Sequence, residues 1–140
     1  MNIDSIKNGF VIDHITAGLG MQIYHFLGLD TLSCPVAIVK NALSRKMGKK
    51  DIIKVDTDIP IDLSALGYID PDVTVNVIEN GKLVKKYHPE LPIEITDIVK
   101  CKNPRCITTT EQELSHVFRL TNRETRTYRC IYCESEAKRS

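Results

Sequence analysis

The chain has 140 residues, of which 42% are hydrophobic and 26% are charged; these values are typical of a globular protein and argue against a disordered or fibrous chain. Its 19 Lys and Arg residues against 18 Asp and Glu residues give a net charge of +1, so we expect no global attraction to nucleic acid or to an anionic membrane. No apolar run approaches the ~20 residues of a membrane span, and the first residues lack the basic and apolar regions of a signal peptide, so we expect a cytoplasmic location.

The first part of the chain alternates strand-like and helix-like patterns. Residues 10–15 form a short apolar run that predicts a strand. Apolar side chains at helical spacing then predict a helix from Ala17 to about Leu27. Two β-branched runs, 35–39 and 51–55, predict further strands, and the polar, basic stretch 44–50 separates them.

A hairpin is the clearest element of the middle region. It is preceded by residues 62–66, which predict at most a short second helix that Gly67 ends. Residues 73–78 alternate like a strand, and residues 82–88 can form the return strand. The Asn80-Gly81 pair between them is a strong signal for a tight hairpin turn.

Two prolines, Pro89 and Pro92, bracket a break at which the composition changes. One cysteine precedes this break, whereas four follow it in a stretch with no convincing helix. We therefore expect two domains, 1–92 and 93–140.

The four late cysteines form the pattern Cys101-x4-Cys106-x23-Cys130-x2-Cys133. Cytoplasmic thiols stay reduced, so such pairs predict metal ligands, and zinc takes four thiolates at the corners of a tetrahedron. Strands at 117–120 and 125–129 can carry both pairs to one end of a small sheet. The segment 93–140 is too small to fold on apolar burial alone, so a structural metal would supply the stability that its core lacks. Four cysteines leave no open coordination position, which disfavours catalytic zinc.

Three other interpretations of the cysteines stay open. Two disulfides fit a cytoplasmic chain poorly, and a redox pair at Cys130 and Cys133 would need a βαβ context that is missing. An iron–sulfur cluster is compatible with four thiolates but is rarer at this spacing. Cys34 stands alone in an apolar run and is interpreted as a small buried hydrophobic residue.

The sequence contains no clear arrangement of a nucleophile and a base. The one histidine beside a carboxylate is His14, which follows Asp13, and adjacent residues of a strand point to opposite faces. No P-loop spacing is present around Gly48. We therefore expect a non-catalytic chain.

Local positive charge is the remaining feature. It occurs in two clusters: Arg45, Lys46, Lys49, Lys50 and Lys54; and Lys82, Lys85 and Lys86. Composition alone favours a solvated face. Lys54, however, shares a strand face with Ile52, and Asn76 lies within a Val-rich strand. Lysines beside apolar side chains and an amide suit a nucleotide, whose phosphates would contact the lysines and whose base would lie on the apolar wall.

Several stretches together resemble one family, the regulatory chain of aspartate carbamoyltransferase. They are Val11-Ile-Asp-His14, Met47-Gly-Lys-Lys-Asp-Ile-Ile-Lys54, Thr74-Val-Asn76, the Pro89–Pro92 junction, Cys-Lys-Asn-Pro-Arg-Cys and Cys-Ile-Tyr-Cys. The resemblance implies an α+β fold: a mixed β-sheet domain with two helices on one side (ferredoxin-like), followed by a small all-β zinc-ribbon-like domain.

The same resemblance implies function and partners. Such chains are non-catalytic subunits that dimerise through the allosteric domain and bridge trimers of the catalytic chain, which their zinc domains contact. CTP inhibits and ATP activates at one shared site, with UTP assisting CTP.

Carried over by motif position, the resemblance also implies a set of site residues. Asp13 and Lys54 would hold the ribose, and the phosphates would face Lys50, Lys86 and His14. The base and sugar pocket would be lined by Ile6, Val11, Asn76, Ile78 and Leu83. Asp4 and Gly81 depart from the family, which places a glutamate and a larger residue there. The metal ligands would be Cys101, Cys106, Cys130 and Cys133.

A zinc-ribbon module that binds nucleic acid is the alternative function. Its phosphate contacts would be Arg105, Arg119, Arg123, Arg126 and Arg129, and its candidate stacking aromatics Phe118, Tyr128 and Tyr132. Five glutamates are interspersed with these arginines, and such a mixed-sign surface suits a protein partner better.

Overall fold

The computed structural model describes residues 6–59 and 61–137 of the chain. These residues fall into two compact units, the first ending at Glu90 and the second beginning at Leu91. Each unit is built around an antiparallel sheet with few helical residues, so the α+β fold class is confirmed. Within the described residues no helix has the length and apolar character needed to cross a membrane.

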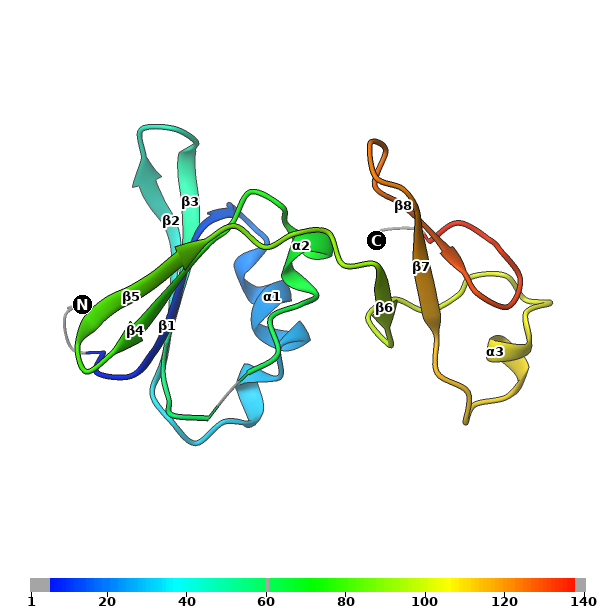
Figure 1. Ribbon diagram of the computed structural model, residues 1–140, viewed down its shortest axis with the longest axis horizontal. Helices are drawn as coiled ribbons and strands as arrows, with labels where there is room; N and C mark the ends of the chain where they lie inside the picture. Colours follow the sequence, from blue (N-terminus) through cyan, green and yellow to red (C-terminus); the bar gives the residue numbers. More distant parts are fainter. Residues whose placement is uncertain (1–5, 60, 138–140) are drawn as a thin grey trace. The chain divides into compact units, whose positions relative to one another are not determined.

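The first unit combines five strands with short helices (Figure 1). Its elements in chain order are β1 (Gly9–Thr16), α1 (Gly20–Phe26), the 3₁₀ turn η2 (Leu29–Thr31), β2 (Val36–Ser44), β3 (Gly48–Asp56), α2 (Leu66–Ile69), β4 (Thr74–Glu79) and β5 (Lys82–Tyr87). The strand order is β2-β3-β1-β4-β5. Without the edge strand β5 this is the order of a ferredoxin-like split βαβ fold.

All four strand pairings in the described part of this sheet are antiparallel, where the family resemblance implied a mixed sheet. The reason is topological, because β2–β3 and β4–β5 are hairpins and β3 inserts between β1 and β2. Helices α1 and α2 lie on the same side of the sheet (Figure 1). The hydrophobic core lies between the sheet and these two helices. It includes Ile12, Ile23, Ile53, Leu66 and Val75.

Helix α1 is shorter than predicted at its start. The prediction began it at Ala17, whereas it begins at Gly20. Gly18 has a φ of 100°, which is not helical, and the backbone N–H groups of Gly18 and Gly20 bind a carboxylate instead of joining a helical turn. The second predicted helix is also displaced, since α2 includes Gly67 and does not end there.

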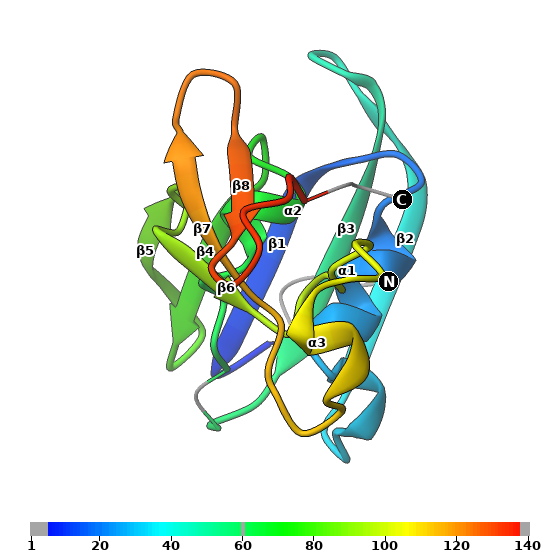
Figure 2. The same ribbon diagram turned by 90° about the vertical axis from the view of Figure 1, so that its right-hand side faces the viewer.

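The β2–β3 hairpin is longer than predicted. The stretch 44–50 was expected to be a connection, but β2 continues to Ser44 and β3 resumes at Gly48. Gly48 has a φ of 77°, a left-handed conformation that suits a tight turn. The hairpin consequently extends beyond the rest of the sheet (Figures 1 and 2).

The second unit is a small three-stranded sheet (Figure 2), and two of its turns carry cysteines. Its elements are β6 (Glu94–Thr96), the one-turn helix α3 (Ile107–Thr110), β7 (Val117–Asn122) and β8 (Thr127–Cys130). The strand order is β6-β7-β8. Phe118 and Tyr128 are almost fully buried within it, and the Tyr128 hydroxyl donates to the Pro92 carbonyl. The strands at 117–120 and 125–129 were predicted, whereas α3 was not.

Candidate functional site: a four-cysteine metal centre and a row of side chains on the outer sheet face

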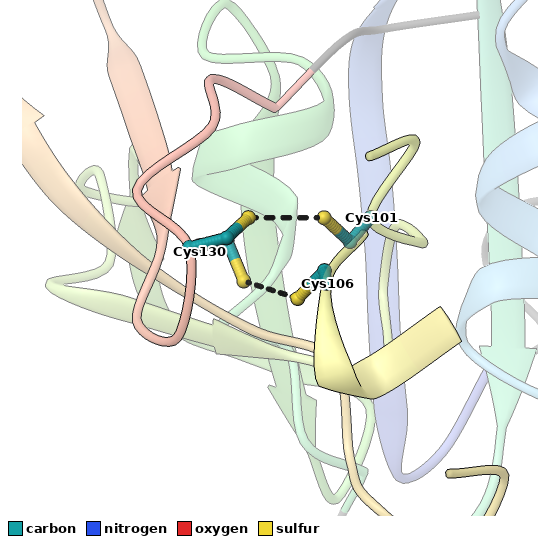
Figure 3. Close-up of side chains that lie close together, drawn as sticks. Cys101, Cys106 and Cys130 are labelled. Atoms are coloured by element: carbon teal, nitrogen blue, oxygen red, sulfur yellow. Dashed lines mark hydrogen bonds between the residues drawn. The ribbon is translucent and has the colours of Figure 1, made fainter. Parts of the chain in front are cut away.

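The four late cysteines meet at one point. Each Sγ atom lies within 4.8 Å of the other three, and Cys101, Cys106 and Cys130 are buried. The side chains of these three cysteines lie close together in Figure 3. Cys101 and Cys106 flank the turn before α3, and Cys130 ends β8, so the β7–β8 pairing carries the second turn to the first. The cluster is thus positioned to bind a metal ion.

The sulfur–sulfur distances fit a single ion. The Sγ atoms of Cys101 and Cys133 are 3.6 Å apart, and those of Cys106 and Cys130 are 3.7 Å apart. Ligands 2.3 Å from a tetrahedral ion are about 3.8 Å from one another, close to these values. A disulfide would need about 2.0 Å.

Two hydrogen bonds support the cysteines from outside. The buried Thr108 hydroxyl lies 3.1 Å from the Cys106 Sγ atom. His116 Nδ1 accepts a 3.0 Å hydrogen bond from the Cys101 backbone N–H, which identifies Nε2 as the protonated nitrogen of the neutral ring. Such contacts fix the orientation of metal ligands. Neither residue was predicted, because no sequence motif marks a side chain that acts through a ligand.

The thiols differ in acidity. Burial raises the pKa of Cys101 to about 12, and burial also raises the pKa of Cys130. Burial acts in the same direction on Cys133, but hydrogen bonds from Ser135, Asn103 and Cys101 outweigh it and lower the pKa of Cys133 to about 6. A cationic metal ion would offset the cost of burying the thiolates.

In the first unit, strand pairing aligns four of the predicted residues. Val11 of β1 faces Lys54 of β3 on one side and Asn76 of β4 on the other, and Asn76 in turn faces Lys86 of β5. Directly paired residues of an antiparallel sheet project to the same face. The two lysines therefore end a row of three inter-strand spacings, about 14 Å.

This row lies on the outer face of the sheet, the side opposite α1 and α2. The residues that alternate with it, among them Ile12, Ile53 and Val75, belong to the core on the helical side. Lys54 is only 5% exposed, yet no described residue forms an ion pair or a side-chain hydrogen bond with it. Its aliphatic stem is buried beside Val11, which is 6% exposed.

The remaining predicted residues lie around this row. Ile78 pairs with Leu83 beyond a register shift in the β4–β5 ladder, so Ile78 lies two residues after Asn76 and Leu83 lies three residues before Lys86. Leu83 is 59% exposed. On the other side of the row, the Lys50 ammonium group lies 3.0 Å from the Asp13 carboxylate. Ile6 is buried but precedes β1, so strand pairing does not place it in the row.

Asp13 and His14 do not follow the expected alternation. A β-bulge interrupts the register between Ile12 and Ile15, and His14 has a φ of 58°. The His14 Nδ1 atom lies 3.2 Å from the hydroxyl of the buried Thr74, which is the cross-strand partner of Asp13. The bulge therefore brings two residues to one place that a regular strand would separate. Of the two departures from the family, Gly81 has a φ of 77° in its turn, and Asp4 lies outside the described residues.

Comparison with known proteins decides the family. A model described as "Aspartate carbamoyltransferase regulatory chain, allosteric domain" matches residues 1–90. A second, described as "Aspartate carbamoyltransferase regulatory chain, metal binding domain", matches residues 93–140. The chain belongs to the aspartate carbamoyltransferase regulatory chain family. The resemblance noted in the sequence is thereby confirmed.

Individual regulatory chains of this family are similar over nearly their whole length. The chain of Clostridium acetobutylicum is 46% identical over 134 residues, which cover 96% of this chain and 92% of that one. The chain of Clostridium botulinum (strain Hall) is 49% identical with the same coverage. That of Bifidobacterium longum is 42% identical over 138 residues, 99% of each chain. The family thus links this chain to pyrimidine biosynthesis, and a regulatory chain implies a catalytic chain as partner.

Proposed function

We propose that this chain is a non-catalytic regulatory subunit that binds CTP and ATP, and also UTP, on the outer face of its first unit. The observation that carries the proposal is the row Lys54–Val11–Asn76–Lys86, in which apolar and amide groups lie between two lysines. A nucleotide needs these elements: cations for its phosphates, and an apolar surface with a hydrogen-bonding group for its base and sugar.

Within this site each residue has a role that follows from its position. The Lys54 ammonium group has no ion-pair partner among the described residues and is available to the ribose oxygens of the ligand. Lys50 is paired with Asp13 and can exchange this contact for a phosphate, which leaves Asp13 to accept from ribose hydroxyls. Lys86, His14 and Lys50 face the phosphates, while Ile6, Val11, Asn76, Ile78 and Leu83 line the base and sugar pocket. The charge of the lysines favours a triphosphate over a nucleoside.

We further propose that the four thiolates hold one structural Zn²⁺. Zinc prefers four soft ligands in a closed tetrahedron, and the sulfur spacing is compatible with a single ion of this kind. The metal would supply cross-links in a unit whose hydrophobic core is small. With all four positions taken by protein, it would have no catalytic role.

The catalytic chain is proposed to contact the second unit near the metal. Three exposed apolar residues, Ile107, Ile131 and Tyr132, lie in or beside the two cysteine turns, and we call them the knuckle surface. Apolar and aromatic side chains of this kind are enriched in protein interfaces. The first unit would form the contact between two regulatory chains, and its edge strands β2 and β5 each present a row of backbone groups outward. We also propose that the protein is cytoplasmic.

The burial of two candidate stacking residues argues against the nucleic-acid alternative. Phe118 and Tyr128 are each 1% exposed, so neither can stack on a base. Of the three candidates, only Tyr132 is exposed. Arg119 lies 3.7 Å from Glu94, which reduces its availability to phosphate. We therefore favour nucleoside triphosphates over a nucleic-acid polymer.

Isothermal titration of the full chain with CTP and with ATP tests this function, together with elemental analysis of the purified protein. We expect both nucleotides to bind in competition with each other and one zinc ion per chain. Binding to DNA or RNA that falls steeply with salt, with no affinity for CTP or ATP, would show that the alternative is right. Iron in place of zinc would contradict the metal assignment alone.

A further inference from the structure

The carboxylate of Asp51 is fully buried and lies among backbone donors from two separate segments. Its Oδ2 atom accepts hydrogen bonds from the N–H groups of Gly18 (3.1 Å) and Gly20 (3.0 Å), at the turn between β1 and α1. Its Oδ1 atom accepts from the N–H of Asn41 in β2, at 3.0 Å. No described residue forms an ion pair with it. Three backbone amides thus hold this carboxylate.

The contacts coincide with irregularities in both strands that pair with β3. The register with β1 shifts between Ile12 and Ile15, and the register with β2 shifts between Val39 and Ala42. His14 and Asn41, inside these two bulges, have φ values of 58° and 59°. A bulge leaves backbone groups outside the ladder. The carboxylate gives the Asn41 N–H the acceptor that the ladder does not provide.

The segment of β3 that contains Asp51 also contributes to the proposed nucleotide site. Lys50, the residue before Asp51, projects to the outer face and lies 3.0 Å from Asp13. Asp51 projects to the other face and holds the turn that follows Asp13 and His14. A buried charge that lost one of its donors would be strongly disfavoured. A movement of the turn at Gly18 and Gly20 would therefore affect the bulge at Asn41 in β2, and the reverse also holds.

We propose that Asp51 is a positioning residue of the nucleotide site, which ties the bulge bearing Asp13 and His14 to the bulge of the edge strand β2. The inference rests on the proposed function and deepens it. Nucleotide binding orders the β1 bulge, and through Asp51 it also orders β2 around Asn41. By reciprocity, whatever stabilises β2 in this conformation raises the affinity for nucleotide.

Asp70 offers a matched control. It is also buried, at 2% exposed, and its carboxylate accepts from the backbone N–H groups of Thr16 (2.7 Å) and Asp72 (3.2 Å). It therefore supports the same turn, but no hydrogen bond joins it to a described residue of β2. Asp51→Asn and Asp70→Asn each remove one buried charge, and only the first removes the link to β2.

The test is amide hydrogen exchange of the full chain with and without CTP, combined with titration of CTP. In the unmodified chain we expect CTP to slow exchange of the Asn41 amide severalfold. In Asp51→Asn this effect should disappear and the Kd for CTP should rise about tenfold, which is within the usual scale of coupling between sites. In Asp70→Asn the response at Asn41 should persist.

A second variant keeps the test decisive if Asp51→Asn does not fold. A Cβ atom at Gly20 would lie 2.7 Å from the Asp51 Oδ2 atom, so Gly20→Ala displaces the carboxylate while its charge stays. We expect a weaker response at Asn41 and weaker CTP binding in this variant too. A chain that binds CTP without any change at Asn41, or an Asp51→Asn variant with unchanged affinity, overturns the inference. A chain that binds neither CTP nor ATP overturns the proposed function itself, which is a distinguishable result.

Discussion

Replacement of Lys54 by methionine is the sharpest test of the nucleotide site. The Lys54 side chain is 5% exposed, so alanine would leave a cavity, whereas methionine retains most of the buried stem and removes the charge. The variant loses one charge-assisted hydrogen bond to the ligand. Such a bond contributes about 1.5–3 kcal/mol, which corresponds to a rise in the Kd for CTP of roughly ten- to 150-fold.

The assay is calorimetric titration of CTP and ATP into the full chain, with Lys49→Ala as the control. Lys49 lies on the same strand and is exposed, and the sequence pattern places it on the opposite face from Lys54. Its removal costs the same formal charge, but screening by salt should keep the change in Kd within about twofold. The melting temperature of each variant shows whether the fold is intact.

Lys54→Ala should abolish the nucleotide response of the assembled enzyme while assembly with the catalytic chain stays intact, because the proposed knuckle surface belongs to the other unit. Equal affinity of Lys54→Met and the unmodified chain for both nucleotides would refute the assignment of the row. An equal loss in Lys49→Ala would show that net charge, and not position, governs binding.

Four further predictions concern the metal centre and its surface. Removing the metal with a chelator should abolish assembly with the catalytic chain while CTP binding survives; normal assembly of the stripped chain would contradict this. Thr108→Val removes the hydroxyl 3.1 Å from the Cys106 Sγ atom and should speed loss of metal to a chelator about tenfold; an unchanged rate would exclude the contact. Because burial raises the pKa values of Cys101 and Cys130, zinc must displace their protons, so apparent zinc affinity should fall as pH falls below neutral in a chelator competition; a pH-independent affinity would argue against thiolate binding. Ile131→Asp places a charge on the 41% exposed Ile131 and should weaken assembly more than tenfold at constant zinc content; full assembly would exclude the knuckle surface.

The metal centre could be predicted from the sequence because its determinants are local. Cys101 and Cys106 share one turn, and Cys130 and Cys133 share another, so only the pairing of two short strands remains to bring them together. Alternation along the strand predicted that Lys54 shares a face with Ile52, but the register that joins Lys54 to Asn76 through Val11 is a property of the sheet.

Tertiary contacts account for what the sequence did not reveal. The predicted helix loses its first residues and begins at Gly20, because a carboxylate 31 to 33 residues away binds the amides of Gly18 and Gly20. The bulge at His14 depends on pairing with two other strands, and no local pattern marks it. Asp51 begins a β-branched run, in which an acidic residue is normally expected to face solvent. Its complete burial follows from tertiary contacts that the sequence does not indicate.

Titration of CTP and ATP into the complex of this chain with its aspartate carbamoyltransferase catalytic chain tests the central claim most directly. The two chains should co-purify, and the two nucleotides should shift the aspartate dependence of the activity in opposite directions through one shared site. Coupling between regulatory and catalytic sites is of the order of 1–3 kcal/mol, so shifts of severalfold are expected. Failure to co-assemble, or an assembled complex whose activity ignores both nucleotides, would contradict the account.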